Sequence, residues 1–154
     1  MKDKPHGCDL RKGRVSLTGH VYLVTAVAHE RQPLFTDIKV GRTIVQRMMH
    51  SGRVGDTESW AFVVMPDHFH WLLVLAGEKS LSEVIGAVKR HSARQINEID
   101  RCSGRQIWQR GFHDHALRRD EDVAQVARYI VANPLRAGLV KRIGDYPLWD
   151  AIWL

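Results

Sequence analysis

The chain has 154 residues, of which 44% are hydrophobic, so its length and composition fit one globular domain with a buried core. Its 23 Lys and Arg residues outnumber 17 Asp and Glu residues and give a net charge of +6, which favours a polyanionic partner such as nucleic acid. The sequence has no CxxC pair, no secretory leader and no apolar run of membrane-spanning length, so we expect a reduced cytoplasmic protein without a zinc knuckle and without a membrane partner.

The chain begins with a polar segment followed by a strand and a helix. Residues 1–13 are polar and basic, and we expect them to form a loose arm. Residues 20–27 are rich in β-branched and aromatic side chains, which predicts a strand. Residues 35–50 carry apolar side chains at helical spacing, and Thr36 is the predicted N-cap of this helix.

Two further strands are predicted in the middle of the chain. In residues 59–65, Trp60, Phe62 and Val64 would point to one face of a strand and Ala61, Val63 and Met65 to the other. Residues 68–75 are almost continuously apolar. Only Pro66 and Asp67 separate these segments, which predicts a tight antiparallel pair.

The remaining elements are a helix, a strand and a last helix. Residues 80–100 have an apolar stripe at helical spacing, with a cap expected at Ser80 or Ser82. Residues 113–119 are predicted as a fourth strand. Residues 120–134 are predicted as the last helix, since acidic side chains stand at its start and a proline limits its end.

The order of these elements predicts the fold class. Strand, helix, strand, strand, helix and strand make the split βαββαβ arrangement. We therefore expect an α+β fold, in which a ferredoxin-like antiparallel sheet has helices on one face and an additional C-terminal helix carries a tyrosine. Residues 14–143 would form this domain. Residues 144–154 are predicted to be an irregular but apolar tail that packs back on it.

Two histidines stand one residue apart in the most apolar predicted strand. His68 and His70 project to the same face because side chains alternate along a strand. Such a pair can converge on one divalent cation, and the alternative is a pair of partly buried imidazoles bonded to backbone or carboxylates. The apolar surroundings favour a partner such as a metal. A second pair, His113 and His115, is not assigned as ligands.

The last predicted helix carries a tyrosine and an asparagine, whose phenol and amide groups can take part in catalysis or metal binding. Tyr129 and Asn133 are four residues apart, so they would stack on one face of a continuous helix. Asn133 offers an amide oxygen, which a hard cation accepts as a ligand. The structural alternatives are a tyrosine that fills space and an asparagine that ends a helix before a proline.

Four segments of the chain together resemble a known family. MPDHFHWLLV (65–74) and YIVANPLRAGLV (129–140) resemble the single-strand DNA transposases of insertion sequences, which use one catalytic tyrosine and a His-hydrophobic-His motif. IWQRGFHDHALR (107–118) and GHVYLVTAVAHERQPLF (19–35) extend the resemblance to one branch, the REP-associated tyrosine transposases. The resemblance covers about residues 14–143, which would then be the catalytic domain.

The resemblance implies a role for each matched residue. His68 and His70 would bind Mg²⁺ or Mn²⁺, Asn133 would be the third protein ligand, and Tyr129 would be the nucleophile. It implies a metal-dependent endonuclease and strand transferase that nicks and rejoins single-stranded DNA at REP-type hairpins through a 5′-phosphotyrosine. It also implies a nucleoid-associated monomer, rather than a dimer that exchanges tyrosine helices.

Further side chains are expected to contact the DNA. Cationic groups meet phosphates and position a substrate without reading its sequence. Trp60, Trp71, Trp108 and Tyr22 offer stacking surfaces for unpaired bases, although core packing is favoured for the first two. The basic candidates are Arg11, Lys12, Arg14, Lys89, Arg90, Arg94, Arg118, Arg119 and Arg136.

Two other functions stay open at this point. A catalytically silent nucleic-acid-binding module would use the same sheet to display side chains to bases. A metal phosphoesterase that activates water would take His68, His70, His113 and His115 as ligands and would not need Tyr129.

Overall fold

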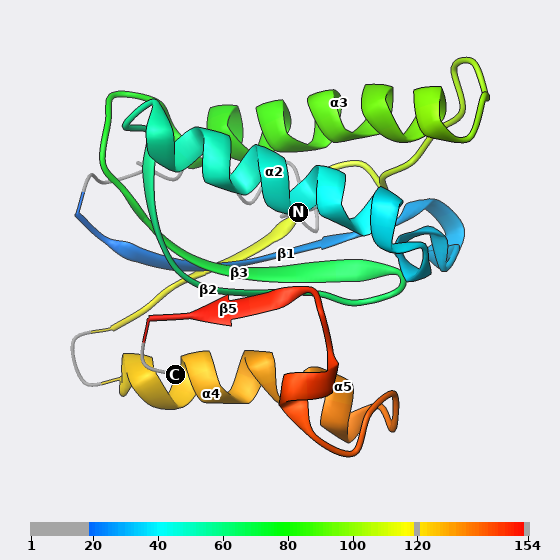
Figure 1. Ribbon diagram of the computed structural model, residues 1–154. Coiled ribbons are helices and arrows are strands. Elements are labelled where there is room, and N and C mark those ends of the chain that lie inside the picture. The colour runs from blue at the N-terminus through cyan, green and yellow to red at the C-terminus, as the bar shows by residue number, and fades with distance from the viewer. Residues whose placement is uncertain (1–18, 119–120, 153–154) are drawn as a thin grey trace, which may run out of the picture.

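The computed structural model describes residues 19–118 and 121–152, which form one antiparallel sheet with helices on both faces (Figure 1). The strands, in the spatial order β4-β1-β3-β2-β5, are β1 (Val21–Val27), β2 (Thr57–Val64), β3 (His68–Leu75), β4 (His113–Ala116) and β5 (Trp149–Ala151). The helices are α2 (Ile38–Arg53), α3 (Leu81–Ile99), α4 (Val123–Val131) and the short α5 (Asn133–Arg136), with 3-10 turns at His29–Arg31, Leu34–Thr36 and Ile143–Asp145.

Side-chain caps define where the two long helices begin. The predicted cap of α2 at Thr36 is wrong, because Asp37 accepts a hydrogen bond from the backbone N–H of Lys39 at 2.9 Å. Ser80 caps α3 and accepts from the backbone N–H of Glu83 at 3.1 Å, as one of the two predicted alternatives requires. Within the described ranges, no helix is long and apolar enough to span a membrane.

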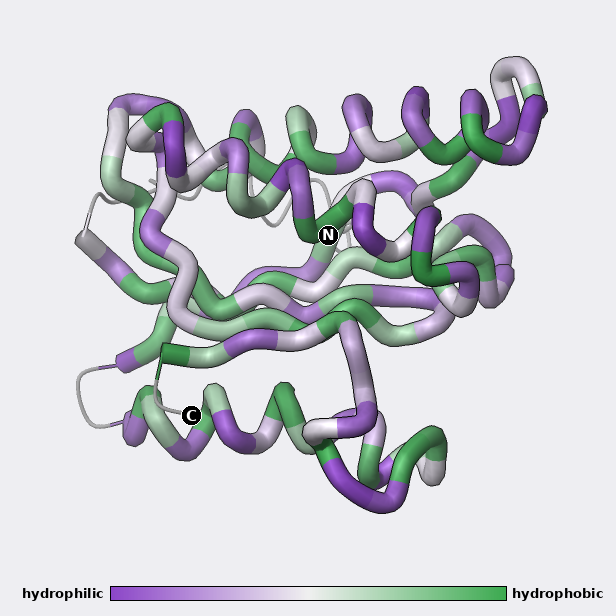
Figure 2. Tube along the Cα trace, in the orientation of Figure 1, coloured by the Kyte–Doolittle hydropathy of each residue, from purple (hydrophilic) through white to green (hydrophobic). Residues whose placement is uncertain are grey.

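Strand β3 contributes to two hydrophobic cores, one on each face of the sheet. Phe69 and Trp71 are fully buried in the core beneath α2 and α3. Leu72 points to the opposite face, where it packs with Ile130 and Val131 of α4. Figure 2 shows hydrophobic stretches along the central strands and on the sheet-facing turns of α3. Helix α4 therefore covers the face opposite α2 and α3 (Figure 1).

Three of the aromatic residues considered for base stacking belong to the core instead. Tyr22, Trp71 and Trp108 are all buried. The indole N–H of Trp71 donates to the Ser59 hydroxyl at 2.8 Å, and that of Trp108 donates to the Ser92 hydroxyl at 3.2 Å. The stacking prediction is wrong for Tyr22 and Trp108, whose rings are buried inside the domain, and the favoured prediction of core packing is confirmed for Trp71.

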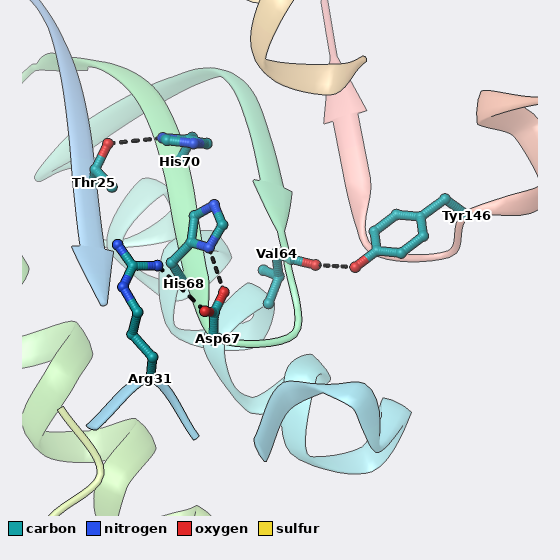
Figure 3. A network of polar contacts seen from close by, with 7 residues as sticks. All are labelled: Thr25, Arg31, Val64, Asp67, His68, His70 and Tyr146. Carbon is teal, nitrogen blue, oxygen red and sulfur yellow. Dashed lines mark hydrogen bonds and ion pairs between the residues drawn. The ribbon is translucent and has the colours of Figure 1, made fainter. Parts of the chain in front are cut away.

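The C-terminal tail is more regular than its sequence predicts. Residues 149–151 form β5, which pairs with β2 and extends the sheet. The backbone N–H of Val64 donates to the carbonyl of Leu148 at 2.9 Å, and Leu148 is buried. The Tyr146 hydroxyl also donates to the carbonyl of Val64 (Figure 3). A strand of three residues is too short for alternation to be recognised.

The hydroxyl of Tyr146 is expected to stabilise this tail. We predict that Tyr146→Phe lowers the free energy of unfolding at neutral pH by about 1–2 kcal/mol, because the Val64 carbonyl loses its donor. Burial raises the pKa of Tyr146 above its usual 10.0. The extra stability of the wild-type protein over the variant should therefore be fully present below pH 10.0, and it should be lost as the pH rises through the raised pKa of the folded state. Urea unfolding at neutral and strongly alkaline pH measures both effects.

The matched control is Tyr129→Phe, which removes a hydroxyl from a side chain that is 65% exposed. This variant should unfold like the wild-type protein. An equal loss of stability in the two variants would contradict a specific role for the Tyr146 hydroxyl.

Candidate functional site

The register of the sheet places the histidine pair on the face that α4 covers. His70 lies opposite Thr25 of β1 and Val63 of β2, and His68 lies opposite Val27 of β1. The two imidazole centroids are 4.9 Å apart, and the ring planes meet at 77°. Two side chains from alternate positions of one strand thus form a compact pair of nitrogen ligands.

Each imidazole has its Nδ1 atom engaged by a neighbouring side chain (Figure 3). Nδ1 of His68 lies 2.6 Å from Oδ1 of Asp67, and Arg31 donates to the other carboxylate oxygen at 3.3 Å. Nδ1 of His70 lies 2.7 Å from the hydroxyl oxygen of Thr25. With the proton on each Nδ1, the lone pair is on Nε2, which is the arrangement that metal-binding histidines need.

The charge states of the site also suit metal binding. Burial lowers the pKa of His70 to about 4, and the positive charges of His68 and Arg136 act in the same direction. His70 is therefore neutral at physiological pH and can act as a ligand. Burial tends to raise the pKa of Asp67, but its hydrogen bonds and ion pairs with His68 and Arg31 outweigh burial and hold that pKa below its usual value.

Three residues around the pair carry no recognisable motif of their own. Asp67 stands directly before His68, and this adjacency was the available signal, although an aspartate after a proline is also an ordinary turn residue. Thr25 is 45 residues from His70 in sequence, and only the pairing of β1 with β3 brings the two together. Arg31 reaches Asp67 from a 3-10 turn.

Helix α4 carries Tyr129 on its exposed side. Asp122 caps this helix by accepting from the backbone N–H of Gln125 at 3.1 Å. The guanidinium carbon of Arg136 lies 3.8 Å from the centroid of the Tyr129 ring. The charge of Arg136 also contributes to the low pKa of His70. Arg136 therefore contacts the Tyr129 ring and acts electrostatically on His70.

Asn133 does not share a helix with Tyr129, so the prediction of one continuous helix is wrong. Helix α4 ends at Val131, because Pro134 has no N–H to donate to the carbonyl of Ile130 four residues earlier. The side-chain amide nitrogen of Asn133 donates to that carbonyl at 2.8 Å instead. This bond occupies the nitrogen end of the amide and leaves its oxygen end to act as an acceptor or ligand.

The available donor atoms fit a divalent cation. Two imidazoles and an amide oxygen are ligands that Mg²⁺ or Mn²⁺ accepts. In the part of the chain that the structure describes, no three His, Cys, Asp or Glu side chains are arranged to hold a metal. A third ligand from the described residues would therefore be a group of another kind, and Asn133 stays the predicted one.

The second histidine pair does not join the first. Strand β1 separates β4 from β3, so that Thr25 stands between His113 and His70 in the same row across the sheet. His115 lies 2.9 Å from the carboxylate of Glu121 and so links β4 to the segment before α4. The four-histidine metal site required by the phosphoesterase alternative is therefore not formed by the described residues.

The basic residues predicted to bind DNA are spread over the molecule. Nζ of Lys89 donates to the carbonyls of Gln109 at 2.8 Å and Gly111 at 2.6 Å, so it holds the segment before β4. Arg90 and Arg94 share α3 with Lys89, on the face of the sheet away from the histidines. The candidates outside the described residues are Arg11, Lys12, Arg14 and Arg119. The remaining candidates are Arg118, which is exposed after β4, and Arg136 beside Tyr129.

The chain is similar to known transposases in sequence. The family model described as "Transposase IS200 like" matches residues 16–133. The REP-associated tyrosine transposase of Escherichia coli K12 is 32% identical over 88 residues, which cover 56% of this chain and 50% of that protein. A relative from Haemophilus influenzae is 31% identical over 99 residues, covering 58% and 56%. The chain thus spans about half the length of the curated relatives it matches.

A solved structure agrees with this result. A REP-associated tyrosine transposase bound to a REP hairpin superposes with a TM-score of 0.70 and 26% identity, covering 88% of this chain and 79% of that one. The predicted α+β fold class and the predicted resemblance are both confirmed. Because the family model matches most of its length, the chain belongs to the IS200-like transposase family.

Proposed function

We propose that this protein nicks and rejoins single-stranded DNA at REP-type hairpins, with a divalent cation and a 5′-phosphotyrosine intermediate. The observation that carries the proposal is the shared face of the sheet: His68 and His70 of β3 point to the face that α4, the helix of Tyr129, covers.

A DNA hairpin is the proposed partner. The similar solved structure is one of a REP-associated tyrosine transposase bound to a REP hairpin. The net charge of +6 fits a polyanionic ligand, and Arg136 lies beside the proposed nucleophile. A guanidinium at that place is suited to binding the phosphate that reacts.

His68, His70 and Asn133 are the residues that would hold Mg²⁺ or Mn²⁺. When bound, the cation supplies Lewis-acid stabilisation of the charge that develops on the phosphodiester oxygens. Asp67 and Thr25 keep the two imidazoles in the required tautomer and orientation.

The proposed reaction transfers the 5′ phosphate of the DNA from a 3′ oxygen to the tyrosine oxygen. The phenolate oxygen of Tyr129 attacks phosphorus, the bond from phosphorus to the 3′ oxygen breaks, and that oxygen takes up a proton and leaves as a 3′ hydroxyl. The 5′ phosphate stays linked to Tyr129. Rejoining reverses the step, since a 3′ hydroxyl attacks the phosphotyrosine and releases the phenol. The bond energy is conserved, so no other energy source is needed.

The site is proposed to be complete within one chain. Helix α4 packs against β2 and β5 of its own sheet through Ile130, Val131 and their neighbours. The tyrosine helix therefore covers the histidine-bearing face of its own sheet, which supports a monomer that acts with its own tyrosine.

The nucleophile can be tested by trapping. We expect the wild-type protein, incubated with labelled single-stranded hairpin DNA and Mn²⁺, to form an adduct that survives denaturation. Tyr129→Phe should form none, because the attacking oxygen is missing, and gel electrophoresis measures the difference. Cleavage without an adduct, unchanged in the variant, would instead support hydrolysis by water. Binding without cleavage under any metal would support a silent binding module.

The residues that orient the imidazoles can be tested through metal affinity. We predict that Asp67→Asn weakens Mn²⁺ binding by about 10- to 100-fold, because the carboxylate no longer holds the His68 ring. Calorimetric titration measures the affinity. His113→Gln changes a histidine on the same face of the sheet but outside the pair, so it should bind Mn²⁺ like the wild-type protein. A similar loss in both variants would contradict the assigned ligands.

Mixing inactive variants tests whether one chain supplies the whole site. Tyr129→Phe lacks the nucleophile and His70→Ala lacks a ligand, so neither should form the adduct alone. Their mixture should also stay inactive, because each tyrosine helix packs on its own sheet. Recovery of the adduct in the mixture would show that helices are exchanged between chains and would overturn the monomer proposal.

A further inference from the structure

A polar cleft lies between α2 and α3, on the face of the sheet away from Tyr129. Its volume is about 350 Å³. Arg47 and His50 of α2 and His91 of α3 contribute to its walls. Asp56 is also part of the wall, but Lys79 neutralises it through an ion pair of 3.1 Å. The cleft is therefore separate from the site described above, and its nitrogen donors stand among apolar side chains, mainly of α3.

One of these donors is buried without an acceptor. Nε of Arg47 is inaccessible to solvent and has no hydrogen-bond partner among the described residues. A guanidinium is charged at every accessible pH and has only donors, so a buried N–H of this kind is costly unless an acceptor reaches it. An anion in the cleft would offset this guanidinium charge, because it supplies the opposite charge together with acceptors for the N–H groups that line the cleft.

The surroundings of the cleft are electropositive. Burial lowers the pKa of His91, and the positive charges of Arg47, Arg90 and Arg94 and the imidazole of His50 lower it as well. All the charged groups that act on this imidazole are thus of the same sign. Such a cluster repels protons and attracts anions.

We propose that the cleft between α2 and α3 binds a phosphate group of the DNA backbone. Guanidinium and imidazole N–H groups are the donors that protein–DNA contacts use for phosphate oxygens. The sheet separates this cleft from Tyr129, so the phosphate held here belongs to a part of the DNA that is not being cut. The choice of DNA as the source of the phosphate rests on the proposed function.

The test is the salt dependence of hairpin binding, measured by fluorescence anisotropy in a Tyr129→Phe background. Each phosphate contact adds about 1 to the slope of log affinity against log salt concentration. We expect Arg47→Met and Lys79→Gln each to reduce this slope by about 1, and each to weaken binding by about tenfold at fixed salt, because both remove a positive charge that lines the cleft. Arg42→Gln is the matched control, because it removes the same charge from an exposed position of α2 outside the cleft.

The control decides between a specific contact and general attraction. A slope that stays unchanged in the Arg47 and Lys79 variants, or falls equally in Arg42→Gln, overturns the proposal. Arg47→Met keeps an unbranched side chain in place of the buried stem, and the Lys79 side chain is half exposed, so Lys79→Gln decides alone if Arg47→Met does not fold. Because the background lacks the nucleophile, these results are independent of adduct formation. Absence of the adduct in the wild-type protein would instead reject the proposed function.

Inorganic phosphate distinguishes a small-anion site from a DNA site. Added phosphate should shift the imidazole NMR resonances of His50 and His91 in the wild-type protein, more than chloride does at the same ionic strength. The shift should be lost in Arg47→Met. If phosphate produces the shift but the DNA slopes stay unchanged, the cleft takes a free anion and the proposal of a DNA contact is wrong.

Discussion

The pairing of β1 with β3 is the constraint on which the rest of the site depends. It sets Thr25 opposite His70, so that a hydroxyl from one strand holds an imidazole from the other. It also turns Phe69 and Trp71 into the core beneath α2 and α3. A shift of one residue would exchange the two faces, burying the imidazoles under the long helices and exposing the aromatic rings to α4. Core and site are therefore specified by the same register.

Much of the fold was predictable from local patterns. Strand β3 has the predicted bounds, 68–75, and β1 begins one residue later than predicted. Strong periodicity explains this success, because long apolar stripes and strand alternation are carried by many residues at once. The histidine pair and Tyr129 were visible for another reason, since ionisable or phenolic groups beside apolar stretches stand out without any three-dimensional information.

Other features depend on contacts that no local pattern contains. Thr25 is an ordinary strand residue until the register places it at His70. The helix break before Asn133 results from a single missing N–H at Pro134. The apolar periodicity of the helix continues up to Val131 and does not reveal this break, so the predicted helix extended to residue 134. Trp108 looked available for stacking, yet its isolated bridge to Ala28 and its bond to Ser92 place it in the interior.

Strand β5 has a consequence for how copies of this chain could associate. Its three residues lie along β2, whose outer backbone groups would otherwise be free to pair with another strand. Two chains therefore cannot pair through Ala61–Val63 of β2 while Trp149–Ala151 stays in place. Among the described residues, the edge strands β5 and β4 are short, with three and four residues. Strand β5 thus protects this part of the β2 edge from pairing with a strand of another chain.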